Sequence, residues 1–401
     1  MTREPTRRQF HARTLAAVTA TVAASPPRAR AAASETVNVA VMGVRGRGNS
    51  VMRSFAREKD VRITHICDVD SGVRERRVDE LTKGTPHRPV AVKDYRSILD
   101  DKQVDVLVVC TPDHWHALPT IHACQAGKDV YVEKPDGHNI REGQMMVAAA
   151  RKYGRCVQMG TQARSAPYVE EAKQYVAEGH LGKVLFGKAW ETARQGAIPR
   201  VADGDAPTGV DYDMWLGPAP KRPFNRYRFH SNWRWFFDYG CGDLGNDGVH
   251  RLDYCRMLMG VDTMPHTISA MGGKMFFDDA QEWPDTMCVN LAFGGKAAND
   301  NEPPAPDAII TYEMRLWTRH HLEGQTEGAA VYGENGWVMM THRGWQAFDA
   351  SGKRVKAGGD DEAQQRHVRN FLDCVRSRNW RDLKQEIASG HISSVMCHAG
   401  N

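Results

Sequence analysis

Apolar positions follow two different patterns along this chain. Up to about Gln162, short continuous runs of Val, Ile, Leu and Met alternate with stretches whose apolar residues recur at helical spacing. Continuous apolar strands that alternate with helices are typical of a parallel sheet with helices on both faces. The expected strands are 37–43, 61–70, 104–112, 129–135 and 155–162.

The pattern changes after about Arg164. A helix is expected over 168–179, and the later strands are longer and alternate apolar with polar positions, which indicates an open, largely antiparallel sheet with one buried face. These strands are expected at 183–193, 286–293, 308–317 and 329–340, with a polar, Pro-rich hairpin loop at 294–307 and an amphipathic helix at 362–378. The sequence therefore predicts an α/β protein with two different sheets.

Length and charge narrow the class of protein. A chain of 401 residues exceeds one ordinary core, so two domains are expected. The formal net charge is +4, but residues 1–31 hold six Arg and one Glu, 6 − 1 = +5, which leaves 4 − 5 = −1 for the remainder. A nearly neutral body gives no indication of nucleic-acid binding. No apolar run approaches the roughly 20 residues of a membrane span.

The first 35 residues are excluded from the fold. Arg7-Arg8-Gln9-Phe10 precedes a mildly apolar stretch at 15–24 and small residues at Ala31–Ala33. This order resembles a twin-arginine export signal, and it predicts a periplasmic or otherwise exported protein that meets the twin-arginine export machinery. A disordered basic arm is the alternative.

The nine cysteines agree with that export route. Their number is odd and no pair has Cys-x-x-Cys spacing, so they form neither an obvious disulfide framework nor a metal motif. Twin-arginine export carries proteins that are already folded, which allows reduced cysteines and a cofactor loaded beforehand.

A glycine-rich loop follows the first strand. The stretch "VAVMGVRGRGNS" places Gly43, Gly46 and Gly48 between a strand and a helix, a variant of the G-x-G-x-x-G loop that cradles a dinucleotide pyrophosphate. Alone it is a weak signal, and a plain glycine turn is the alternative. Arg45 and Arg47 of this loop are also expected to contact the cofactor.

Asp68 strengthens this hypothesis. It ends the second strand, 25 residues after Gly43, where a carboxylate can accept hydrogen bonds from the adenosine ribose hydroxyls. An acid there disfavours a 2′-phosphate, so NAD is expected rather than NADP. A solvated strand end is the alternative for Asp68.

Three further segments identify a family. They are "TPDHWHA" (111–117), "EKP" (133–135) and "GCGDLGNDGVHRLD" (240–253). With the glycine loop, in this order, they closely resemble the Gfo/Idh/MocA oxidoreductases, the glucose–fructose oxidoreductase and inositol dehydrogenase superfamily, over most of 37–401.

The resemblance implies a domain organisation and a reaction. A Rossmann domain that binds NAD(P) is expected over 36–162, and a substrate and oligomerisation domain with an open sheet over 163–401. The implied reaction moves a hydride between the nicotinamide of a tightly held cofactor and a secondary hydroxyl carbon of a sugar, sugar derivative or cyclitol, in a homo-oligomer. The chain ends in "GHISSVMCHAGN", which is short for the family.

The resemblance also assigns residues. Lys134 of "EKP" matches the family's active-site lysine, and His250 matches its second-domain histidine. The family often has an acid four residues before that histidine, but here Asn246 stands there and Asp247 follows. We therefore expect Asn246 to orient a substrate hydroxyl, with Asp247 beside it in the substrate site.

The chemistry supports the same pair. Oxidation of a secondary alcohol removes a hydroxyl proton as the hydride leaves, and a histidine has a pKa suited to accept it. A neighbouring lysine stabilises the developing alkoxide, and Pro135 restricts the backbone of Lys134. Which of Lys134 and His250 is the base stays open, as does a purely structural role for His250.

The remaining candidates surround these two residues. By the family match, Thr111, Pro112, Asp113 and His116 line the nicotinamide ribose side, with Glu133 as a further cofactor contact. Aromatic faces stack on sugars, so Trp233 and Trp235 of the Arg- and aromatic-rich stretch 225–240 are candidate substrate contacts, with core packing as the alternative. Gln162 and Arg164 of "GTQARS" are weaker candidates. His114 and His116 lack further ligands, so we expect no metal site.

Two other functions remain open on this scaffold. A redox glycosidase would oxidise a sugar hydroxyl transiently, eliminate, hydrate and regenerate NAD with the same lysine and histidine. A non-catalytic carbohydrate-binding protein would keep the fold without turnover.

Overall fold

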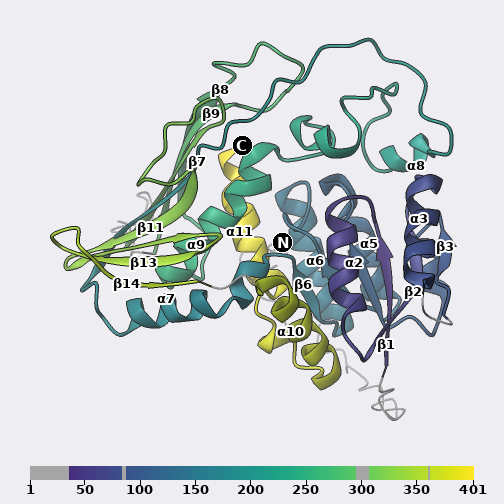
Figure 1. The fold of residues 1–401 in the computed structure, drawn as a ribbon, viewed down its shortest axis with the longest axis horizontal. Helices are drawn as coiled ribbons and strands as arrows, with labels where there is room; N and C mark the ends of the chain where they lie inside the picture. Colours follow the sequence, from purple (N-terminus) through teal and green to yellow (C-terminus); the bar gives the residue numbers. More distant parts are fainter. Residues whose placement is uncertain (1–35, 84–86, 295–306, 360–361) are drawn as a thin grey trace, which may run out of the picture. The chain divides into compact units, whose positions relative to one another are not determined.

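Six short apolar strands form a parallel sheet in the N-terminal half of the chain (Figure 1). They lie in the order β3-β2-β1-β4-β5-β6, which is the strand order of a dinucleotide-binding Rossmann sheet. Their bounds are β1 (Val37–Met42), β2 (Val61–Cys67), β3 (Val90–Val92), β4 (Val106–Val109), β5 (Asp129–Val132) and β6 (Val157–Met159). Strands β4, β5 and β6 are buried at every position, because helices cover both faces of the sheet.

The structure is a computed structural model, and it describes residues 36–83, 87–294, 307–359 and 362–401. The expected export signal and most of the expected hairpin loop lie outside the described residues. Residues Thr36–Asn401 form one compact unit. Within the described ranges, no helix is both long and apolar enough to cross a membrane.

Helices and short turns connect the strands of the first sheet. Asn139 begins α6 by accepting a hydrogen bond from the Glu142 amide, and Gly154 ends it in the left-handed conformation. The bounds are α2 (Arg47–Ala56), α3 (Ser71–Thr82), α4 (Arg96–Asp100), η1 (Asp113–Trp115), α5 (Ala117–Gln125), α6 (Ile140–Tyr153) and η2 (Gln162–Ser165).

Eight strands form the second sheet, in the order β14-β13-β12-β11-β7-β10-β9-β8. Only the β7–β10 pair is parallel among the pairs between neighbouring strands described. Buried and exposed positions alternate along β9, as expected for a sheet with one packed face. The bounds are β7 (Val184–Glu191), β8 (Thr267–Gly273), β9 (Thr286–Phe293), β10 (Ala308–Arg315), β11 (Glu327–Gly333), β12 (Gly336–Thr341), β13 (Gly344–Asp349) and β14 (Arg354–Gly358).

The α/β fold with two different sheets is therefore confirmed, although several strands escaped prediction. The segment 329–340 is not one strand but the hairpin β11–β12, turning at Glu334 and Asn335. Strands β3, β8, β13 and β14 were not expected. They are edge or near-edge strands with many polar or exposed positions, so their apolar pattern is weak.

The last helices of the chain join the two sheets. Helix α10 (Ala363–Ser377) packs on the first sheet, where the ring of Phe371 lies edge-on to those of Phe55 and Tyr131. Helix α11 (Ile387–Gly400) packs against α6 and α9 (Figure 1). Part of the segment expected in the second domain thus completes the core of the first, which the amphipathic pattern of 362–378 could not reveal because it does not say which sheet the helix covers.

The remaining helices belong to the second half of the chain. They are α7 (Pro167–Ala177), α8 (Tyr212–Leu216), η3 (His230–Trp235), a π-helical turn η4 (Leu244–Gly248), α9 (Val249–Leu258) and η5 (Trp380–Asp382).

The packing of α10 gives a test. Phe371 is fully buried between the two rings, so Phe371→Ala should lower the free energy of unfolding by about 3–5 kcal/mol. Urea unfolding followed by tryptophan fluorescence measures this. The exposed Arg366 on the same helix is the control, and Arg366→Ala should stay within about 0.5 kcal/mol. Equal effects of the two changes would contradict the role of α10 in the first core.

Candidate active site and cofactor pocket

The glycine loop closes against the end of β4. Gly43 has a φ of +80°, and a Cβ there would lie 2.7 Å from the Cys110 carbonyl oxygen. A Cβ on Gly48 would lie 1.7 Å from the Gly43 carbonyl oxygen. Gly46 differs, because open space surrounds the position of its missing Cβ. The loop therefore packs tightly on one side and stays open on the other, as a pyrophosphate cradle requires.

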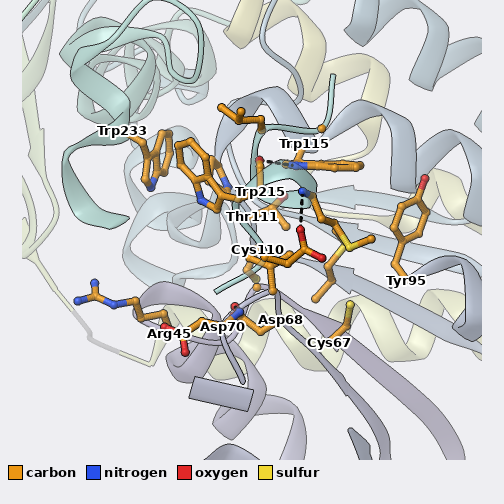
Figure 2. Close-up of a pocket in the computed structure, with 18 of the residues that line it drawn as sticks. Arg45, Cys67, Asp68, Asp70, Tyr95, Cys110, Thr111, Trp115, Trp215 and Trp233 are labelled. Atoms are coloured by element: carbon orange, nitrogen blue, oxygen red, sulfur yellow. Dashed lines mark hydrogen bonds between the residues drawn. The ribbon is translucent and has the colours of Figure 1, made fainter. Parts of the chain in front are cut away.

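A pocket of about 610 Å³ lies over the open side of this loop, at the carboxyl ends of β1, β2 and β4. Figure 2 shows Arg45, Asp68 and Asp70 on one side of it and the indoles of Trp115 and Trp215 on the other. The candidates on its wall are Gly43, Arg45, Gly46, Arg47, Asp68, Thr111, Pro112 and Trp233. The shape and position fit a dinucleotide, since ligands of open α/β sheets bind at this edge.

The second half of the chain supplies the opposite wall of the pocket. The indole nitrogen of Trp115 donates to the Trp215 carbonyl (2.9 Å), and the Asp211 amide donates to the Val69 carbonyl (3.0 Å). Lys93 forms an ion pair with Asp211 at 2.7 Å. The sequence analysis missed this wall, although the N-cap Asp211 and the aromatic "YDMWLG" after it mark a short helix that must bury its rings.

Asp68 braces the loop from the end of β2. Its carboxylate accepts hydrogen bonds from the backbone amides of Val44 (2.9 Å) and Asp70 (3.0 Å). Burial raises the pKa of Asp68, and the two amide bonds oppose that rise. Asp68 thus already fixes the glycine loop. Its expected contact with the ribose hydroxyls stays a prediction.

Arg47 is held by three side chains. Its guanidinium donates to Glu133 Oε1 (2.9 Å), Gln364 Oε1 (2.6 Å) and Gln162 Oε1 (3.3 Å). Glu133 and Gln162 therefore anchor this arginine of the glycine loop. Arg45 reaches across the pocket to Ser231 Oγ at 3.5 Å.

Lys134 is tied to the π-helical turn of the second half. Its ammonium donates to the carbonyl oxygen (2.5 Å) and the side-chain oxygen (2.9 Å) of Asn246, whose Nδ2 donates to Asp247 Oδ2 (3.1 Å). Burial lowers the pKa of Lys134, while the charges of Asp247 and Glu133 oppose that effect. We expected Asn246 to orient substrate; in the structure it positions Lys134.

His250 follows one turn later, at the start of α9. Burial and the charge of Lys134 hold the pKa of His250 well below its ordinary value, so the imidazole is neutral. Its ring makes no hydrogen bond to any other described residue. The site thus combines a buried amine with a neutral imidazole, and a hydroxyl between them meets one donor and one acceptor.

Four expected contacts hold structure instead. Asp113 is buried and accepts from the Cys241 amide, and both ring nitrogens of His116 face backbone carbonyls, those of Pro135 and Thr111. Arg164 forms a two-bond ion pair with Asp253 (2.7 and 2.8 Å), and Trp235 lies in the core of the second half. Each of these side chains is engaged within the protein, and its contact with cofactor or substrate stays a prediction.

Comparison with known proteins agrees with this geometry. Residues 37–161 match the family described as "Oxidoreductase family, NAD-binding Rossmann fold", and residues 169–295 match "Oxidoreductase family, C-terminal alpha/beta domain". The chain belongs to the Gfo/Idh/MocA oxidoreductase family. The Rossmann domain of this family binds NAD, and the residues of the pocket fit that cofactor.

Curated relatives match part of the chain. It is 29% identical over 163 residues to a glycosyl hydrolase family 109 protein of Shewanella baltica, and 29% identical over 163 residues to an alpha-N-acetylgalactosaminidase of Shewanella oneidensis. Each match covers 39% of this chain and 35% of the relative. The chain thus spans about a third of the length of these relatives.

Solved structures match its fold over nearly all its length. The aldose-aldose oxidoreductase of Caulobacter crescentus has a TM-score of 0.65 at 18% identity, covering 91% of this chain and 96% of that one. The WlbA dehydrogenase of Bordetella pertussis, in complex with NADH and UDP-GlcNAcA, has a TM-score of 0.66 at 16% identity, covering 91% and 95%. A levoglucosan dehydrogenase in complex with NADH and levoglucosan has a TM-score of 0.65 at 18% identity, covering 91% and 97%.

The two glycines of the loop predict opposite outcomes. Gly46→Ala places a methyl group in open space on the pocket wall, so NAD affinity should fall roughly tenfold while the melting temperature stays near wild type. Gly48→Ala collides with the loop itself and should destabilise the fold by about 1–3 kcal/mol. Calorimetric NAD titration and thermal unfolding measure the two effects. A stable Gly48→Ala protein with unchanged NAD affinity would contradict this account of the loop.

His114 predicts an acid limit to stability. Its ring nitrogens face the carbonyls of Tyr239 (3.2 Å) and Trp215 (3.0 Å), and burial lowers its pKa from 6.5 to about 4. Between pH 6.5 and pH 4 the unfolded chain therefore binds a proton at this histidine that the folded chain does not bind. The free energy of unfolding falls as the pH drops through this range, and His114 accounts for about 3 kcal/mol of that fall.

The test is the pH dependence of urea unfolding in His114→Gln. The variant should lose part of the acid slope that wild type shows. The same change at the exposed His320 is the control and should leave the slope unaltered. A His114→Gln slope identical to wild type would rule out a buried neutral ring.

Proposed function

We propose that this protein is an NAD-dependent oxidoreductase that moves a hydride between the nicotinamide and a secondary hydroxyl carbon of a sugar, sugar derivative or cyclitol. One observation carries the proposal: Lys134, at the carboxyl end of β5, is held by Asn246 beside a neutral His250. It adjoins Glu133, which anchors Arg47 of the glycine loop. The amine and the imidazole are thus close enough for the charge of one to act on the other, and Arg47, held by the neighbouring Glu133, lies on the wall of the dinucleotide pocket.

The charge state of each residue in the site determines its proposed role. Bound NAD supplies the hydride acceptor. Lys134 donates a hydrogen bond to the reacting oxygen and stabilises the negative charge that grows on it. His250, neutral and without a hydrogen-bond partner for its ring in the described part of the chain, can accept the hydroxyl proton. Because burial lowers the pKa of Lys134, the amine can also exchange a proton, so either group can act as the base.

The comparisons support a sugar-like substrate. The WlbA dehydrogenase binds a nucleotide sugar and the levoglucosan dehydrogenase binds levoglucosan, each with NADH. Trp233 on the pocket wall offers an aromatic face of the kind that stacks on sugar rings. The Arg7-Arg8 pattern supports export of the folded, cofactor-loaded enzyme.

The second candidate is a redox glycosidase, favoured by the similarity to glycosyl hydrolase family 109 proteins. It would use the same lysine and histidine. The two functions separate by their products: a dehydrogenase accumulates NADH with a free sugar, whereas a glycosidase releases an aglycone without net NADH. Turnover of neither kind, with no bound nucleotide, would instead indicate a carbohydrate-binding protein.

The lysine gives the direct test of this site. Lys134→Met keeps the aliphatic stem but removes the charge, so turnover should fall by about 10²–10⁴-fold while NAD stays bound. The assay is NADH absorbance and aglycone release over a panel of sugars and aryl glycosides. Lys173→Met, on the exposed face of α7, is the control and should match wild type. Full activity in Lys134→Met would refute the assignment.

A further inference from the structure

Asp243 begins the π-helical turn beneath Lys134, and it is unusual among the acids of this protein. Its side chain is 1% exposed, and neither carboxylate oxygen has a hydrogen-bond partner among the described residues. Burying a carboxylate without a hydrogen-bond donor costs free energy, so such a group calls for an explanation. π-helical turns occur frequently at functional sites, and this one also carries Asn246 and Asp247.

Two cations lie near Asp243, and one of them is engaged elsewhere. Arg251, on α9, pairs with Glu191 of β7 at 3.2 Å and with Glu327 of β11 at 2.8 Å. One guanidinium thus already faces two carboxylates. Arg234, on η3, acts on Asp243 through its charge alone, without a hydrogen bond to it.

The other groups that face Asp243 are acidic. Asp247 lies four residues further along the same turn, and Glu191 approaches from β7. From β10 comes Tyr312, whose hydroxyl is buried without a hydrogen-bond partner among the described residues and packs at the position of Gly248. Two carboxyl groups and a phenol therefore face Asp243, and within the described part of the chain no cation forms a hydrogen bond with its carboxyl oxygens.

A negative charge on Asp247 disfavours ionisation of Asp243, because like charges in a buried site repel strongly. Asp247 is the better placed to carry the charge. It accepts a hydrogen bond from Asn246 Nδ2, it is only partly buried, and its charge acts on Lys134. Asp243 has none of these supports.

We propose that Asp243 is a neutral carboxylic acid in the folded protein, so that it adds no second negative charge beside Asp247, which accepts a hydrogen bond from the Asn246 side chain that holds Lys134. Its importance for turnover rests on the proposed function of Lys134. Asp243 acts through Asp247 and is a positioning residue.

The electrostatics agree with this geometry. Burial raises the pKa of Asp243 well above its ordinary value, and the charges of Asp247 and Glu191 raise it further against the opposing effects of Arg251 and Arg234. A group whose pKa is raised on folding stabilises the protein at low pH. That stabilisation is lost as the pH rises above the ordinary carboxyl pKa of 3.8.

The test compares Asp243→Asn with wild type by urea unfolding between about pH 5 and pH 8. The amide has nearly the same shape and cannot ionise, so it removes the pH-dependent loss. The ratio of the two unfolding constants should move in favour of the variant as pH rises, by up to about tenfold per pH unit. This readout needs neither substrate nor cofactor, so it stands apart from the test of Lys134.

A control of opposite sign is available in Asp285. This buried carboxylate accepts backbone amides of Met275, Phe276 and Phe277, and its pKa is lowered despite burial. Asp285→Asn should therefore be less stable than wild type by an amount that stays constant between pH 5 and pH 8 and that shrinks only as the pH falls below the ordinary carboxyl pKa of 3.8.

Two outcomes would overturn the proposal. If Asp243→Asn is less stable than wild type by the same amount at every pH from 5 to 8, Asp243 is an ionised carboxylate with a counter-ion. If the two proteins are equally stable at every pH in this range, folding shifts no proton at Asp243. Asp243→Leu, which is apolar and branches at the same carbon, gives the same measurement should the amide fail to fold, with the same direction expected.

Turnover supplies the second readout once a substrate is in hand. Asp243→Asn should remove the part of the alkaline fall in kcat that comes from ionisation of Asp243, leaving the rate near neutral pH close to wild type. A lowered rate with an unshifted pH profile would indicate a structural role only and would overturn the link to Lys134.

Discussion

The contact between Lys134 and Asn246 is the interaction on which the site depends. It joins the carboxyl end of a Rossmann strand to the π-helical turn that leads into α9. One amine therefore fixes the distance between the dinucleotide-binding sheet and the imidazole of His250. The ammonium bonds a backbone carbonyl as well as a side chain, so the alignment does not depend on one rotamer alone. The amide of Asn246 positions the lysine and also donates a hydrogen bond to Asp247.

Burial governs the chemistry of these groups. The pKa of Lys134 and that of His250 are both lowered chiefly by burial, and that of Asp243 is raised by it. All three shifts favour the uncharged form, which is the state from which a proton moves at modest cost. The wall that the 211–234 segment adds to the pocket keeps the cofactor side enclosed as well. The enclosure and the proton chemistry are thus two results of the same packing.

The sequence predicted the parts of this protein that rest on local pattern. Continuous apolar runs located five of the six parallel strands, and the order of the glycine loop, "EKP" and the His250 segment indicated the family. The sequence could not show which candidate side chains would instead form contacts within the protein. Arg164 and Asp113 resemble ligand contacts in sequence, yet long-range partners at Asp253 and Cys241 occupy them. The sequence analysis also missed Asp243, because what distinguishes this residue is the lack of a hydrogen-bond partner for its carboxyl group among the described residues.

The most direct measurement of the central claim is the nucleotide content of the purified protein. The chain should be denatured, the released small molecules identified, and the binding of added NAD measured by calorimetry. This account predicts NAD or NADH in stoichiometric amounts, or saturable binding of added NAD by a protein purified without it. A chain that releases no nucleotide and binds no added NAD would contradict the assignment of the glycine-loop pocket and, with it, the proposed hydride transfer.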